Sequence, residues 1–125
     1  MLVSSKMCMT KDVGTNGNMF GGIMLAFMDE SAAIYAHNMT GEKRMVTKLF
    51  REIVFEKPVK VGDIIEFSCD NIEKGNTSID FSIWAAVDGE IVFETSCVFV
   101  AVDENGIRKP ITKETENGED QSQKE

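Results

Sequence analysis

An acidic residue, Asp29, lies within the most apolar segment of the chain, GGIMLAFMDESAAIYAHN (residues 21–38). If this segment is a helix, steps of four and three residues place the acid on one face with Gly22, Ala26, Ala33 and Ala36. Burying a carboxylate there costs free energy unless it is paired or used, and burial tends to raise its pKa. Raised carboxylate pKa values are common in acid–base catalysis, which makes Asp29 a candidate catalytic residue.

A structural role for Asp29 is the alternative. Either Lys48 or Arg51 is a possible ion-pair partner for its carboxylate. The neighbouring acid, Glu30, lies about 100° further round the helix and is expected to serve structure or solvent exposure.

Two glycines, Gly21 and Gly22, open the same segment. The first turn of a helix leaves backbone N–H groups unpaired, and these groups favour negative charge. Without side chains to block access, they can bind a developing oxyanion. A glycine pair alone is also typical of a flexible loop. The loop at Asn16, the glycine pair and the acid at Asp29 together give a stronger indication of a catalytic site.

Most other catalytic and metal-binding machinery is not indicated. His37 is the only histidine, and the sequence has neither a GxSxG elbow nor a Walker A loop. Cys8, Cys69 and Cys97 have no CxxC spacing, so we expect no disulfide, no metal site and a reducing, cytoplasmic location.

Composition also limits the partners. The net charge of −8 and the pI of about 4.7 argue against nucleic acid as a partner. No apolar run is long enough to span a bilayer, and the start of the chain does not resemble a secretory signal, so no membrane association is expected.

The elements that position these residues follow from periodicity and turn signals. We predict a strand over Val3–Met9, a loop over Asp12–Met19 and a helix over Gly21–Asn38, with Gly41 as its stop. Four strand segments should follow: Val46–Lys57, Ile64–Glu73, Thr77–Val87 and Glu90–Val102.

Tight-turn pairs at Gly75-Asn76 and Asp88-Gly89 indicate that the last three strands are antiparallel neighbours. The order predicts an α+β domain over residues 1–111, followed by a disordered acidic tail over residues 112–125.

The predicted helix is apolar around most of its circumference, so it should be buried on most sides. One sheet covers a helix from one side only. The rest of the chain has no second long helix, so a second copy of the chain is the expected cover.

Several motifs give the sequence a resemblance to the hot-dog-fold acyl-CoA thioesterases of the YciA-type branch, from about Asp12 to Pro110. The motifs are NGNMFGG (16–22), Met28-Asp29, Val46-Thr47, PVKVGD (58–63), KGNTS (74–78) and VAVD (100–103). The resemblance implies a curved antiparallel sheet of about five strands wrapped around a long central helix. It also implies homodimers, often assembled as a trimer of dimers. Acyl-coenzyme A is the implied substrate, with no further cofactor.

The resemblance also implies site residues. Asp29 is the expected catalytic carboxylate, Asn16 positions the thioester or water, and the Gly22 N–H polarises the carbonyl, with Thr47 in support. Phe20 and Gly21 are expected near the substrate.

A turn near the coenzyme A nucleotide corresponds to Lys74, Gly75, Thr77 and Ser78, although without the resemblance it is simply a hairpin turn. The family often has arginine two residues after the position of Thr47. Here that residue is Leu49, followed by Phe50-Arg51.

Asp29 should lie about 10 Å along the helix axis from Gly22, too far for a carboxylate to reach a carbonyl bound at its own helix start. If a second helix runs antiparallel beside it, each Asp29 faces the partner's Gly22 and Asn16. This arrangement predicts two composite sites per dimer.

Two other functions are compatible with the same fold. A non-catalytic acyl-CoA sensor is the main alternative, although such regulators usually have a DNA-binding module and this chain has no basic face. A dehydratase typically needs a histidine near the helix start, and His37 lies about four turns further on.

Overall fold

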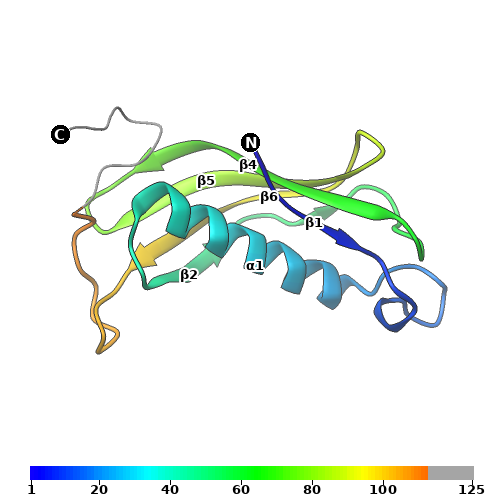
Figure 1. Cartoon of the computed structure of the whole chain (residues 1–125), viewed down its shortest axis with the longest axis horizontal. Coiled ribbons are helices and arrows are strands. Elements are labelled where there is room, and N and C mark those ends of the chain that lie inside the picture. Colours follow the sequence, from blue (N-terminus) through cyan, green and yellow to red (C-terminus); the bar gives the residue numbers. More distant parts are fainter. Residues whose placement is uncertain (113–125) are drawn as a thin grey trace.

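The computed structural model describes residues 1–112, in which a long α-helix lies along one face of a curved antiparallel sheet (Figure 1). The elements in chain order are β1 (Leu2–Met7), the 3₁₀ turn η1 (Thr10–Asp12), α1 (Gly21–Thr40), β2 (Met45–Phe50), β3 (Val54–Phe55), β4 (Ile64–Lys74), β5 (Ser78–Val87) and β6 (Glu90–Ala101). The strand order is β1-β4-β5-β6-β2, and the short β3 pairs with β6 beyond the end of β2. This is the hot-dog fold that the family resemblance implies. No helix within residues 1–112 is long and apolar enough to cross a membrane.

The helix begins and ends close to its predicted limits. Gly41 adopts the left-handed conformation at φ 74° and donates its N–H to the His37 carbonyl, which ends α1. One row of side chains along α1 is buried against the sheet and covers the core: Met24, Met28, Ala32 and Tyr35.

The central strands alternate between the core and the outer face of the sheet. Four fully buried phenylalanines, Phe67, Phe81, Phe93 and Phe99, come from β4, β5 and β6. The β5–β6 hairpin turns at Asp88 and Gly89, with φ values of 52° and 82°, as the Asp-Gly pair predicts.

The prediction of one strand over Val46–Lys57 was wrong. The ladder with β6 shifts register between Thr47 and Leu49, and pairing stops after Phe50 before resuming at β3. Lys48 is the extra residue of a bulge, which bends an edge strand and interrupts its pairing.

The end of the described chain is attached to the end of α1. The carboxylate of Glu42 is nearly buried and accepts bonds from Lys109 Nζ at 2.7 Å and from the Thr112 N–H at 3.0 Å. Together these bonds lower the pKa of Glu42 despite its burial. Thr112, assigned to the tail from the sequence, is thus hydrogen-bonded to the domain. The rest of the predicted tail, residues 113–125, lies outside the described residues.

Candidate active site

The side chain of Asp29 is held by a threonine of the neighbouring edge strand. Thr47 Oγ1 donates a hydrogen bond to Asp29 Oδ1 at 2.8 Å, between the middle of α1 and β2. Thr47 reaches the helix because it pairs with the buried Phe99, which places it on the inner face of the sheet. The donor is a neutral hydroxyl, and it bonds to one of the two carboxylate oxygens.

Neither cation predicted as a structural partner of Asp29 reaches it by a hydrogen bond or an ion pair within residues 1–112. After the bulge at Lys48, Arg51 lies on the outer face of the sheet. There it makes a bidentate salt bridge to Asp80, with N–O distances of 2.8 and 2.7 Å. That carboxylate also raises the pKa of Arg51. Glu30, in turn, pairs with Lys6 at 2.8 Å, in agreement with its predicted structural role.

The row of small residues is shorter than the sequence predicts. Gly22, Ala26 and Asp29 are exposed in the single chain, and Ala33 is half-buried. Ala36 is fully buried, because the chain turns back after Gly41 to form β2 beside the helix. Asp29 is therefore not buried within one chain, contrary to the expectation of an acid inside the core.

Free N–H donors lie at the start of α1. The N–H groups of Ile23 and Met24 both bond to the Phe20 carbonyl, whereas those of Gly21 and Gly22 have no acceptor among residues 1–112. A Cβ at Gly22 would lie 3.3 Å from the exposed Phe20 ring, and one at Gly21 would lie 3.4 Å from the Phe55 ring. The two glycines keep this end of the helix open.

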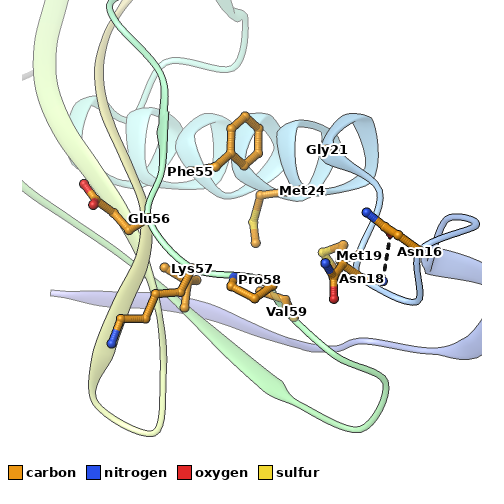
Figure 2. Close-up of a pocket in the computed structure, with 11 residues that line it drawn as sticks. Asn16, Asn18, Met19, Gly21, Met24, Phe55, Glu56, Lys57, Pro58 and Val59 are labelled. Atoms are coloured by element: carbon orange, nitrogen blue, oxygen red, sulfur yellow. Dashed lines mark hydrogen bonds between the residues drawn. The ribbon is translucent and has the colours of Figure 1, made fainter.

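A hydrogen-bonded loop carries Asn16, which lines the same cavity as Gly21. Asn16 Oδ1 accepts the N–H of Asn18 at 3.1 Å, which turns the loop tightly (Figure 2). The Met19 N–H bonds to the Val59 carbonyl at 2.7 Å, and the Phe20 N–H bonds to the Asp12 carbonyl at 2.8 Å. The first bond attaches the end of the loop to the segment after β3, and the second joins the two ends of the loop to each other.

Asp12, at the start of this loop, has a structural role that was not predicted from the sequence. Its side chain is almost fully buried and accepts the Met9 N–H at 2.9 Å and a bond from Lys11 Nζ at 3.0 Å. The Met9 bond is the main cause that lowers the pKa of Asp12. The only sequence signal was an acid three residues after the residue that starts a helical turn.

A cavity of about 340 Å³ opens beside the helix start, between α1 and the segment that follows β3. Asn16 and Gly21 lie at its edge, and Met24, Pro58 and Val59 converge on its interior (Figure 2). Its size is in the range of small-molecule sites.

The turn predicted to contact coenzyme A, Lys74–Ser78, lies at the end of the sheet away from this cavity. Gly75 donates its N–H to the Ser78 carbonyl at 2.7 Å, and a Cβ at Gly75 would lie 3.1 Å from Ser78 Oγ. Val100 pairs with both Val46 and Ser78, so the turn lies two strand spacings, about 10 Å, from the strand of Thr47. Lys74 and Thr77 flank this turn.

The candidate residues therefore fall into two groups within one chain. The donor group consists of Asn16, Phe20, Gly21 and Gly22 at the helix start. The carboxylate group consists of Asp29 and Thr47, with the Lys74–Ser78 turn nearby. Seven residues of helix separate Gly22 from Asp29 (29 − 22), about 10 Å along the axis.

Other reactive groups of the described chain do not offer an alternative centre. Cys8, Cys69 and Cys97 are buried free thiols. Burial raises the pKa of Cys69 to about 12 and also raises that of Cys97, so neither is a thiolate at neutral pH. Within residues 1–112, no group of three or more His, Cys, Asp or Glu side chains is placed to hold a metal ion.

Comparison with known proteins identifies the class. The family model of the thioesterase superfamily matches residues 16–100. The acyl-CoA thioester hydrolase YciA of Salmonella typhimurium is 32% identical over 119 residues, which cover 88% of this chain and 89% of the relative.

Two solved structures are similar throughout the fold. The hexameric thioesterase y2039 of Yersinia pestis has a TM-score of 0.84 at 30% identity, covering 90% of this chain and 96% of that one. An acyl-CoA hydrolase of Staphylococcus aureus, solved with butyryl-coenzyme A, has a TM-score of 0.77 at 28% identity, covering 88% and 68% of the two chains.

The fold and these matches define a member of the thioesterase superfamily. More narrowly, the chain belongs to the acyl-CoA thioester hydrolases of the YciA type.

Proposed function

We propose that this protein hydrolyses acyl-coenzyme A to a free carboxylic acid and coenzyme A, with Asp29 as the catalytic carboxylate. The observation that carries the proposal is the geometry of Asp29, an exposed acid on α1 oriented by a 2.8 Å bond from Thr47. The relatives described above include acyl-CoA thioester hydrolases, which supports the choice of substrate.

The chemistry needs few groups. The thioester carbonyl accepts hydrogen bonds from the free N–H of Gly22 and, next to it, of Gly21, which stabilise the oxyanion as it forms. Asn16 positions the thioester or the attacking water. The leaving thiolate has a conjugate thiol of pKa near 8.5, so its departure needs no strong general acid.

Asp29 has two possible roles in that scheme. It can take a proton from water as a general base, or it can attack the carbonyl and form an anhydride that water then opens. Single-turnover hydrolysis in ¹⁸O-labelled water separates them. Label in the Asp29 carboxylate indicates direct attack, and label in the product alone indicates the general-base route.

The donor group and the carboxylate group meet across a dimer in this proposal. Within one chain the two groups are about 10 Å apart along α1. Gly22 and Asp29 are both exposed on the face of α1 that points away from the sheet. A second α1 running antiparallel would bring each Asp29 opposite the partner subunit's helix start. The small residues Gly22, Ala26 and Ala33 allow two helix backbones to approach closely.

Exposed apolar side chains support the same dimer. Phe20 is 62% exposed at the start of α1, and Ile34 is 40% exposed within α1. A partner helix along this face of α1 would cover both side chains. The hexameric relative is consistent with a trimer of such dimers.

The same proposal gives the Lys74–Ser78 turn a role near the coenzyme A nucleotide, since the turn lies at the same end of the sheet as Val46 and Thr47.

A reducing, cytoplasmic location is supported by the three buried free cysteines.

Steady-state release of free thiol from a panel of acyl-coenzyme A thioesters tests the proposed activity. We expect turnover by the wild-type protein and a loss of most turnover in the Asp29→Asn variant. Binding of acyl-CoA without turnover would contradict the proposal and identify a sensor instead.

A further inference from the structure

The cavity beside the helix start is apolar inside and charged only at its rim. Its apolar lining consists of Met19, Met24, Phe55, Pro58, Val59 and Val92. The charged residues Glu56 and Lys57 turn away from the interior (Figure 2), and Lys57 Nζ pairs with Glu90 Oε2 at 3.0 Å.

We propose that this cavity receives the acyl chain of the substrate and that Met24 forms its inner end and sets the chain length. This inference rests on the proposed function, because a carbonyl bound at the N–H of Gly21 or Gly22 leaves the acyl chain at the cavity entrance. Gly21 itself lines the cavity, which joins the donors to the apolar space.

The exposure of the lining residues shows which end of the cavity is open and which is closed. Phe55 is 53% exposed and lies at the entrance, where its ring would be 3.4 Å from a Cβ at Gly21. Met24 and Val59 are each 3% exposed, so they lie at the closed end. The Met24 side chain points from α1 toward Pro58 and Val59, across the path of an entering chain (Figure 2).

The same lining defines the class of acyl group. A carboxylate or other charge on the acyl chain would be buried without a free cation, since the only lysine of the lining is paired with Glu90. A volume of about 340 Å³ holds on the order of ten heavy atoms if each occupies about 30 Å³, as a water does. The cavity therefore fits unsubstituted aliphatic chains of short to medium length.

The matched test compares two methionines one helical turn apart. Met24 and Met28 are both buried on α1, but only Met24 lines the cavity. The kcat/KM values for butyryl-, octanoyl-, dodecanoyl- and palmitoyl-coenzyme A are measured for the wild type, Met24→Ala and Met28→Ala.

We expect Met24→Ala to make room for about two further methylenes and so to raise the dodecanoyl-to-octanoyl ratio of kcat/KM by roughly 16-fold, since each methylene buried is worth about fourfold. Met28→Ala should change all substrates by the same factor. Met24→Phe, which fills the cavity, should shift the preference toward butyryl-coenzyme A. If Met24→Ala fails to fold, Met24→Phe and the half-exposed Phe55→Ala still test the site, the latter by a loss of octanoyl preference.

A chain-length profile that is unchanged in these variants, or shifted equally by Met28→Ala, would overturn the inference while leaving the hydrolase intact. Failure of the proposed function gives a different result, which is no turnover of any thioester by the wild type. The dissociation constants of non-hydrolysable acyl-CoA thioethers of the same four lengths then still report whether Met24 limits chain length.

Discussion

At the scale of single residues, the contact between Asp29 and Thr47 is the most informative feature. A hydroxyl donor fixes one carboxylate oxygen at 2.8 Å without neutralising its charge, so the other oxygen can take a proton or attack a carbon. A lysine or arginine in the same place would stabilise the charge and weaken the carboxylate as a base.

The Asp29→Asn variant should lose about 10²- to 10⁴-fold in kcat, the usual contribution of a positioned acid–base group. The amide keeps the size of the side chain and its acceptor for Thr47, so the melting temperature and the affinity for coenzyme A should stay close to wild type. Glu30→Gln, at the adjacent acid paired with Lys6, is the control and should remain active. Near-normal turnover by Asp29→Asn would indicate that Asp29 has a structural role and is not catalytic.

Thr47 should act by orienting Asp29, so the hydroxyl and not the size of the side chain should matter. We expect Thr47→Val to lower kcat by roughly 10-fold or more, as the loss of a hydrogen bond to a charged group implies, with a smaller effect on KM. Thr47→Ser restores the donor and should recover most of the activity. An active Thr47→Val together with an inactive Thr47→Ser would show that the methyl group, not the hydroxyl, is what matters.

At the scale of elements, the helix and the hairpins were predictable because their signals are local. Gly41 ends α1 and the Asp88-Gly89 pair turns the β5–β6 hairpin, since both need backbone conformations that glycine favours. The alternation of Ile79, Phe81, Ile83 and Ala85 placed β5 against the core, and all four are buried.

The edge of the sheet was less predictable because it depends on pairing. The bulge at Lys48 comes from the register with β6 and leaves no signal in the sequence of β2 itself. It reverses the alternation, so that Arg51 lies on the outer face with Asp80 instead of near Asp29. The sequence identified Thr47 and Asp29 separately, but their contact depends on this register.

The attachment between the end of α1 and the last described residues should depend on pH. The folded-state pKa of Glu42 is lowered from 4.5, so the carboxylate stabilises the fold above its unfolded pKa, and this stabilisation is lost as the pH falls through the folded pKa. Glu42→Gln should lower the free energy of unfolding at pH 7 by roughly 1–3 kcal/mol, because Lys109 and Thr112 lose a charged acceptor.

The difference between wild type and Glu42→Gln should shrink as the pH is lowered below about 4.5 and the wild-type carboxyl is protonated. Denaturant unfolding at several pH values measures it. The exposed Glu104, which makes no hydrogen bond or ion pair within residues 1–112, provides the control variant Glu104→Gln. A pH-independent difference would mean that the bonds to Glu42 do not depend on its charge.

At the scale of the whole molecule, one chain holds both groups of candidate site residues but does not bring them together. The free N–H groups lie at the start of α1 and the carboxylate lies about 10 Å further along the axis. An antiparallel pair of helices would complete two sites at once, cover the exposed apolar residues beside α1 and agree with the hexameric assembly of a close structural relative. The central claim is therefore that each active site takes residues from two chains.

Mixing two inactive variants, Asn16→Ala and Asp29→Ala, tests that claim most directly. Subunit exchange is confirmed first with differently tagged chains, and each variant alone must show no turnover. Each mixed dimer then contains one intact site and one site that lacks both residues. Random exchange makes half of the dimers mixed, so about a quarter of the wild-type activity should return. Confirmed exchange without any recovered activity would show that Asn16 and Asp29 act within one chain, and the composite site would be wrong.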